Sequence, residues 1–170
     1  MYETDAELRD LQTLLDRSHD VAGENLRALF NEQRRLSAER LCRMLTGVQV
    51  LNLATVTADC RPLVSPVDGL FFHGRFHFSS SPDSVRFRHI RRRPQVSASH
   101  TRGEDVAVIV HGTAHIIDIA SPVHAAFRAH LIDTYGPGWE SWGAGSLHAR
   151  IDPATMFAVQ MHGSAGDESS

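Results

Sequence analysis

At Gly47 the spacing of apolar residues changes from that of helices to that of strands. Before this point, from Asp5 to about Leu45, apolar residues recur every three or four positions, which predicts two or three amphipathic helices. After it, residues 48–57 are largely apolar, rich in β-branched side chains and free of Gly and Pro, which predicts a buried strand. Helices at one end and strands beyond them favour a fold in which the two are segregated.

Further strand-like runs follow, and short turns join most of them. We predict strands at 61–72, 75–79, 95–101, 106–118 and 156–161, with helices at 82–92 and 121–135. Hairpin-joined strands with one crossing helix favour an antiparallel barrel over repeated βαβ units. The expected fold class is therefore mainly β (α+β): an antiparallel β-barrel with an N-terminal helical extension and peripheral helices.

The second predicted strand contains Pro62 and Pro66. Proline is tolerated in sheets only at edges, bulges and strand ends, because it has no N–H to donate. Something other than a neighbouring strand is therefore expected to face that backbone.

A chain of 170 residues has room for one domain with a core of its own. We predict an N-terminal helical extension at 1–46, a barrel domain at 47–162 and a disordered tail rich in Gly, Ser, Asp and Glu at 163–170.

Charge and cysteine content indicate which partners and which cellular compartment to expect. The net charge of -3 provides no global attraction for nucleic acid or an anionic membrane. The N-terminus is acidic and no run approaches the roughly 18 to 20 apolar residues of a membrane span. Cys42 and Cys60 fall in a predicted helix and a predicted turn, which argues against a disulfide framework. We expect a cytoplasmic protein with no nucleic-acid or membrane partner.

The segment from Phe78 to Pro94 is the strongest candidate for an anion site. Ser81 can cap the helix predicted at 82–92, and the free N–H groups of a helix start attract anions. Arg86, about one turn in, can add a charge-assisted contact, and nearby serines offer hydroxyl donors.

A plainer interpretation of the same segment stays open. Ser81 would only cap the helix, the arginines would be solvated, and the carboxylate of Asp83 would compete with a bound phosphate. Arg91, Arg92 and Arg93 are expected to complement the helix C-terminus rather than a ligand.

Several segments, in this order and spacing, carry a family resemblance. They are 51–56 (LNLATV), 61–67 (RPLVSPV), 76–80 (FHFSS), 84–91 (SVRFRHIR) and 110–114 (VHGTA). Together they resemble the FMN-binding split barrel of pyridoxamine 5'-phosphate oxidase-like proteins over roughly 48–118. The resemblance implies a homodimer with a cofactor at the subunit interface, and a small-molecule substrate.

The resemblance also implies cofactor-binding residues. The second strand would lie along the flavin ring, and the end of the third strand with the following helix would bind the phosphate. Arg88 is a second-rank candidate, because two helical positions turn it about 200° from Arg86, and it could serve the dimer interface. The implied residues are Val64, Ser65, Pro66 and Val67 for the ring, and Ser79, Ser80, Ser84, Arg86 and Arg88 for the phosphate.

The chain also departs from the family's namesake. Ser65 stands where the true oxidases carry a basic residue, and their arginine-containing substrate motif is not visible in 151–161. Vitamin B6 oxidation is therefore not expected. The resemblance implies an FMN-dependent oxidoreductase, with an F420-dependent reductase as the alternative and a non-catalytic flavin or haem carrier as the rival class. No catalytic acid or base can be named, because the cofactor supplies the redox chemistry.

Histidine and tryptophan leave two further questions. The 11 histidines show no metal-ligand spacing, so no metal is expected. His73, His77, His100 and His111 could ligate a haem iron, although a structural role is expected for each. Trp139 and Trp142 lie in a glycine-rich segment and are expected to pack on the barrel, with a lid over a flat ring as the alternative.

Overall fold

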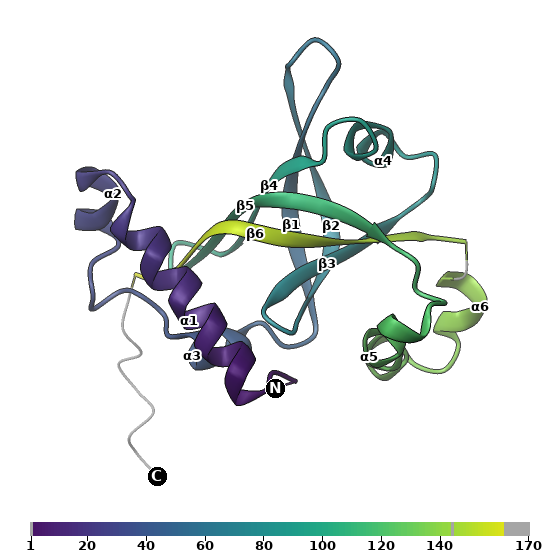
Figure 1. The fold of residues 1–170 in the computed structure, drawn as a ribbon, viewed down its shortest axis with the longest axis horizontal. Coiled ribbons are helices and arrows are strands. Elements are labelled where there is room, and N and C mark those ends of the chain that lie inside the picture. The colour runs from purple at the N-terminus through teal and green to yellow at the C-terminus, as the bar shows by residue number, and fades with distance from the viewer. Residues whose placement is uncertain (1, 144, 162–170) are drawn as a thin grey trace.

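In the computed structural model, which describes residues 2–143 and 145–161, six antiparallel strands close into a barrel (Figure 1). The strand order around the barrel is β1-β2-β3-β6-β5-β4. The strands are β1 (Val48–Val56), β2 (Pro62–Phe72), β3 (Arg75–Ser80), β4 (Gln95–Arg102), β5 (Val106–Ile117) and β6 (Leu147–Gln160). The helices are α1 (Asp5–Asp20), α2 (Glu24–Leu29), α3 (Ala38–Met44), α4 (Val85–Ile90), α5 (Ala125–Tyr135) and α6 (Trp139–Gly143). The expected split-barrel fold class is confirmed.

Three predicted elements differ from the observed ones, and the first two are β6 and the helix predicted at 121–135. β6 begins at Leu147 rather than at 156, because polar residues on its outer side interrupt the apolar pattern of its first half. The helix predicted at 121–135 is divided into a 3-10 turn, Pro122–His124, and α5. The tail predicted at 163–170 lies outside the described residues.

The helix predicted at 82–92 is shorter than expected and begins later. Its N-cap is Ser84, whose side chain accepts a hydrogen bond from the Phe87 N–H at 3.4 Å. The predicted cap, Ser81, instead accepts from the Asp83 N–H in the preceding turn. Pro82 is therefore outside the helix, and α4 spans six residues.

Alternating side chains of the strands fill the barrel. Leu51 and Leu53 of β1, Phe76 of β3 and Val108 of β5 are almost completely buried, whereas their neighbours in sequence point outward. This period of two is expected for strands with one face in a core. A tight turn at His73-Gly74 joins β2 to β3, with φ of 51° and 72°, the left-handed conformation of a type I′ turn.

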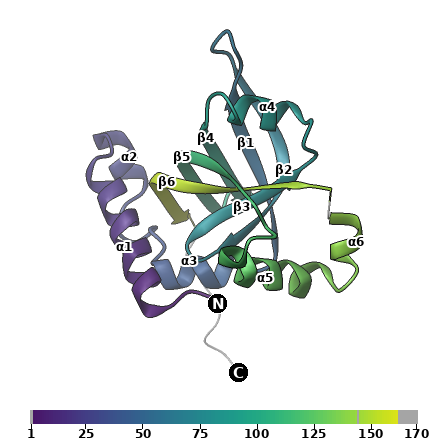
Figure 2. The ribbon, with the colours of Figure 1, turned by 45° about the vertical axis from the view of Figure 1, so that its right-hand side comes forward.

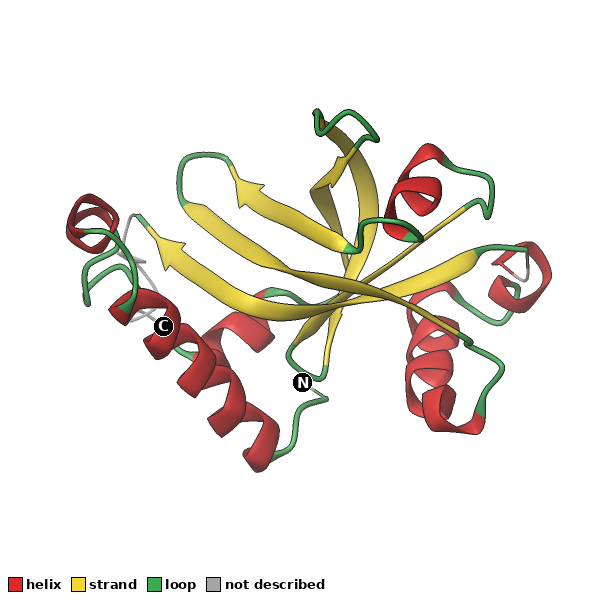
Figure 3. Ribbon diagram, turned by 45° about the horizontal axis from the view of Figure 1, so that its top comes forward, coloured by secondary structure: helices red, strands yellow, loops and turns green. Residues whose placement is uncertain are grey.

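Two groups of helices lie on opposite sides of the strands (Figure 3). On one side α1 and α3 place Leu11, Leu15, Leu41 and Leu45 in the same apolar core as the barrel. Each of the two helices begins with a side-chain cap: Thr4 forms a capping box with Glu7, and Ser37 accepts from the Arg40 N–H. These helices therefore seal one side of the barrel with aliphatic side chains.

On the other side α5 and α6 cover a separate apolar cluster. Its buried members are Leu70, Phe72, Ile117, Phe127, Leu131 and Trp139. Buried imidazoles lie among these rings: His77 stacks on Phe127 with ring centroids 4.1 Å apart, and His130 stacks on Phe72 at 5.0 Å. Burial lowers the pKa of His77 to about 3. It also lowers the pKa of His130 and of His148.

β5 and β6 approach each other closely at a β-bulge between His111 and Gly112. A Cβ atom on Gly112 would lie 2.2 Å from the carbonyl oxygen of Asp152. The side chain of Asp152 accepts two hydrogen bonds from Arg150, at 2.7 and 2.9 Å, and pairs with Arg75 at 3.3 Å. Only glycine fits at this seam without moving the opposite strand.

The hairpin between β1 and β2 extends beyond the barrel as an arm beside α4 (Figure 2). At its tip Cys60 is exposed and has a positive φ of 62°. Cys42 is buried, and both cysteines are free. Among the described residues, no helix is long and apolar enough to cross a membrane.

Candidate cofactor site

A cleft of about 430 Å³ opens beside the part of β2 that lies beyond its pairing with β3. Residues of β1, β2, β3 and α4 line one side of it, and the segment from the end of α5 to β6 lines the other. The lining residues are Val50, Pro66, Val67, Asp68, Ser79, Arg86, Tyr135, Trp139, Trp142 and Ser146.

There is room for the cleft because β2 has only one strand partner over most of its length. β1 pairs with β2 from Pro62 to Leu70, whereas β3 pairs with it only from Gly69 to Phe72. Residues 62–68 therefore leave one edge without a strand, among the described residues. This agrees with the expectation from Pro66, since proline suits a strand edge.

Arg86 of α4 reaches across to this unpaired edge. Its guanidinium donates to the Pro66 carbonyl oxygen at 2.9 Å and to the Ser65 hydroxyl at 3.1 Å. Both acceptors are neutral, and Arg86 forms no ion pair within the described part of the chain. Partial burial lowers the pKa of Arg86, but an arginine stays charged at neutral pH. The cleft therefore contains a fixed positive charge without a paired carboxylate.

The structure brings four of the sequence-predicted residues together at the cleft: Pro66, Val67, Ser79 and Arg86. Ser65 adjoins the cleft through its hydrogen bond with Arg86. Three others do not line it. Val64 is exposed on the outer face of β2, Ser80 is half-buried at the end of β3, and Ser84 caps α4.

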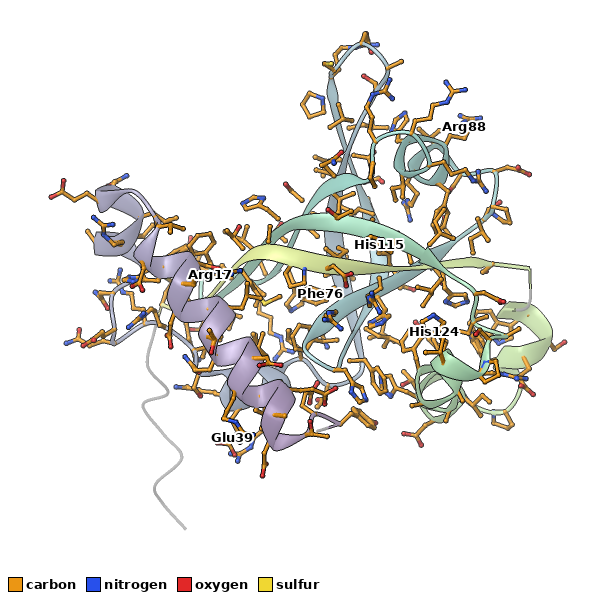
Figure 4. The ribbon with its side chains drawn as sticks, in the orientation of Figure 1. Arg17, Glu39, Phe76, Arg88, His115 and His124 are labelled. Carbon is orange, nitrogen blue, oxygen red and sulfur yellow. The ribbon has the colours of Figure 1, made fainter. Side chains whose placement is uncertain are left out.

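Arg88 lies elsewhere. Figure 4 shows it on the outer side of α4, and it lines a separate hollow with residues 89 and 91–93. The half-turn that separates it from Arg86 along the helix thus places the two guanidinium groups in different depressions.

Three aromatic cleft residues were not among the cofactor-binding residues predicted from the sequence, although Trp139 and Trp142 were considered there as a lid. Tyr135 and Trp142 stack edge to face with centroids 5.6 Å apart, and Trp142 is 63% exposed. Trp139 is buried in the α5 layer, as expected from the packing interpretation, yet it also lines the cleft. The one signal available was the pair of tryptophans in a glycine-rich segment, which does not reveal where α6 is placed.

Tyr135 and Asp68 are the titratable neighbours of Arg86 in the cleft lining. Burial, and then the charge of Asp68, raise the pKa of Tyr135. Its phenol therefore stays protonated at neutral pH and can donate a hydrogen bond.

The four histidines considered for haem have other surroundings. His73 pairs with Glu7, and His77 stacks on Phe127. His100 Nδ1 lies 3.0 Å from the Val50 carbonyl, and His111 Nδ1 lies 2.7 Å from the Ser97 hydroxyl. None of the four lines the cleft. Within the described residues, no group of three or more His, Cys, Asp or Glu could hold a metal ion.

Comparison with known proteins gives a family match and a shared fold. The family model of pyridoxamine 5'-phosphate oxidase matches residues 38–161. A sequence search of curated proteins finds no match.

Solved structures share the barrel at low identity. An FAD-binding protein from Mesorhizobium loti is 22% identical, with a TM-score of 0.59 over 75% of this chain and 95% of that chain. A protein named F420 reductase is 23% identical, with a TM-score of 0.52 over 67% and 93%. HutZ, the heme storage protein from Vibrio cholerae, is 20% identical, with a TM-score of 0.61 over 75% and 99%. At these identities the likeness is one of fold.

Proposed function

Because the chain belongs to the pyridoxamine 5'-phosphate oxidase family, we propose that it is a flavin-dependent oxidoreductase that binds FMN in the cleft beside Arg86. The cleft volume of about 430 Å³ lies within the range of roughly 300 to 1,000 Å³ usual for small-molecule sites.

The observation that carries the proposal is that Arg86 forms no ion pair with any described carboxylate, although Asp68 also lines the cleft. A guanidinium held only by two neutral acceptors can exchange them for a phosphate, which forms stronger charge-assisted hydrogen bonds. The hydroxyl of Ser79, in the same lining, is a further donor. Arg86 and Ser79 would thus hold the phosphate of FMN.

The ring would lie against the unpaired edge of β2. Pro66 and Val67 offer an apolar strand edge there, and Tyr135 and Trp142 offer aromatic faces on the opposite wall. Bound flavin would supply hydride transfer, and the chain's own residues would orient it and exclude water. The lining offers no imidazole as acid or base, and the neutral Tyr135 phenol serves as a hydrogen-bond donor.

The protein is further proposed to act as a homodimer. Val50 and Val64 are 56% and 60% exposed on the outer face of β1 and β2, and Val50 also lines the cleft. An apolar strand face continuous with a binding cleft fits a surface covered by a second copy. Light scattering at micromolar concentration tests this, and a monomer that binds FMN tightly would contradict it.

The test of cofactor binding compares ligands with and without a phosphate. The purified protein is titrated with FMN, F420, haem and riboflavin, followed by visible absorption. Arg86→Ala should weaken FMN by roughly 10- to 150-fold, as expected for a charge-assisted bond of about 1.5 to 3 kcal/mol. Riboflavin affinity should barely change. Loss of both ligands together would mean that the cleft itself was disrupted.

Two further measurements separate the alternatives. Tighter binding of F420 than of FMN would favour the F420-dependent reductase on the same fold. An assay of turnover with a reductant and an acceptor distinguishes an enzyme from a carrier, because a carrier binds the cofactor without repeated discharge. Haem binding is not expected, since no histidine lines the cleft.

A further inference from the structure

A second hollow, of about 460 Å³, lies on the opposite side of α4 from the cleft. It is lined by the end of α4, the turn that follows, and Ala58 of the β1–β2 arm. The lining residues are Ala58, Arg88, His89, Arg91, Arg92 and Arg93. Apart from Ala58, every one is a guanidinium or an imidazole.

The positive charge in this hollow is compensated only in part by the described residues. Arg91 donates to the Pro82 carbonyl at 3.1 Å, and the other three guanidinium groups form no hydrogen bond or ion pair there. No carboxylate lines the hollow. Asp59, on the adjoining arm, accepts from Thr57 and Arg61, both at 2.6 Å. The hydrogen bond from Thr57 contributes most to the lowered pKa of Asp59, and the charge of Arg93 contributes least.

Outside the hollow, some arginines pair with carboxylates and others do not. Arg35, Arg43, Arg61, Arg75, Arg128 and Arg150 each form an ion pair. What distinguishes the hollow is that four arginines without an ion pair among the described residues gather within residues 88–93, in a chain whose net charge is -3.

This arrangement brings like charges together. Arg88 lies in the last turn of α4, and Arg91, Arg92 and Arg93 follow directly after the helix, so four guanidinium groups share one hollow. The dipole of a six-residue helix cannot offset four arginines, since the effect decays within the last turn. An anion in the hollow would relieve the repulsion.

His89 adds a donor of fixed orientation. Its Nδ1 lies 2.9 Å from the Thr55 hydroxyl, which leaves Nε2 as the ring nitrogen without a partner in the described structure. If the hydroxyl donates to Nδ1, Nε2 carries the proton and can donate to a ligand.

We propose that this hollow is a second anion site, which binds a small molecule carrying a chain of two or more phosphate groups. Three free guanidinium forks match several phosphate oxygens, and the hollow is as large as the cofactor cleft. Inorganic pyrophosphate and a nucleoside triphosphate share this chemistry. A nucleic acid is disfavoured, because the cluster is confined to one hollow and the net charge is negative.

Calorimetric titration of the full-length protein with inorganic pyrophosphate and, separately, with ATP tests the proposal at about 0.15 M salt. Both should bind once per chain. Arg92→Gln should weaken both by about tenfold or more. Arg92→Lys should restore only part of the affinity, because it keeps the charge and loses the fork. Tighter binding of ATP than of pyrophosphate would show that the hollow also contacts the nucleoside.

Arg9→Gln is the matched control, since Arg9 is an exposed arginine on α1 that forms no ion pair or side-chain hydrogen bond with the described residues. It should leave pyrophosphate affinity unchanged. Three results would overturn the proposal: no binding by the unmodified protein, equal loss in Arg9→Gln and Arg92→Gln, or loss in Arg86→Ala with full binding in Arg92→Gln. The last would place the anion in the cofactor cleft. Tighter binding of duplex DNA than of pyrophosphate would also overturn it.

Discussion

The two helical covers of the barrel solve the same packing problem in different ways. α1 and α3 begin with side-chain caps and extend the aliphatic core of the barrel. α5 begins without a side-chain cap and lies over a separate cluster of aromatic rings and buried imidazoles. Of the two covers, only the second contributes to the cleft lining, through Tyr135, Trp139 and Trp142.

The difference indicates how stability is distributed. Among the described residues, two imidazole nitrogens under the second cover, His130 Nδ1 and His148 Nε2, are buried without a hydrogen-bond partner, against one, His19 Nε2, on α1 of the first cover. Buried polar groups without partners cost stability. Regions that bind ligands are commonly drawn from the less stable parts of a protein. We therefore expect the first cover to maintain the fold and the second to open first.

The largest effect should come from truncating one leucine under each cover. Leu41→Ala, at a fully buried position, should lower the free energy of unfolding by about 2 to 5 kcal/mol. Leu131→Ala should lower the free energy of unfolding by less, because the small cluster around Leu131 can relax. It should also weaken FMN binding. Urea unfolding and FMN titration measure both. If the two substitutions lowered the free energy of unfolding equally and Leu131→Ala left FMN affinity unchanged, the proposed difference in stability between the two covers would be wrong.

The second effect is acid destabilisation of the α5 cover. The pKa of His77 is about 3 in the fold and about 6.5 in the unfolded chain, so the unfolded chain binds more protons between these values. The contribution of His77 to the free energy of unfolding therefore falls by about 1.4 kcal/mol for each pH unit below about 6.5. The lowered pKa values of His130 and His148 act in the same direction.

Urea unfolding between about pH 7.5 and 5 checks this, above the range in which carboxylates titrate. His77→Phe keeps an aromatic ring beside Phe127 and should reduce the slope of stability against pH. A flat profile in the unmodified protein would show that these imidazoles are not held neutral.

The smallest effect should come from a helix cap on the first cover. The Thr4 hydroxyl accepts from the Glu7 N–H at 3.3 Å, and the Thr4 N–H donates to the Glu7 carboxylate at 2.8 Å. Thr4→Ala should therefore cost about 1 kcal/mol. Hydrogen exchange should locate the loss in α1 and leave the amides of α5 unchanged. A change spread equally over both covers would show that they unfold as one unit.

Features that depend on neighbouring residues could be predicted from the sequence, whereas features that depend on contacts between distant segments could not. Strands with β-branched runs bounded by turn residues were predicted closely, since the signal is local. The first half of β6 was missed because His148 and Arg150 interrupt the apolar pattern, and it becomes a strand by pairing with β3 and β5, which lie far away in the chain. The N-cap was placed at Ser81, three positions before the real one at Ser84, because both serines satisfy the same local rule.

The same distinction separates the predicted residues of the candidate site from those that were missed. Pro66 and Arg86 were predicted from the family resemblance, and the structure joins them by a hydrogen bond. Tyr135 and Trp142 could not be placed, because their position depends on how α5 and α6 dock on a barrel formed by distant strands.

The close approach at Gly112 also governs which sequence changes the barrel can accept. The β1–β2 arm projects away from the core, so substitutions at its exposed tip displace no neighbouring strand. At Gly112 any side chain would collide with the backbone of Asp152, and β5 and β6 would have to separate. In a library of all single substitutions, position 112 should therefore retain glycine alone while the arm tolerates most residues. A designer who diversifies this scaffold would vary the arm and leave the seam untouched.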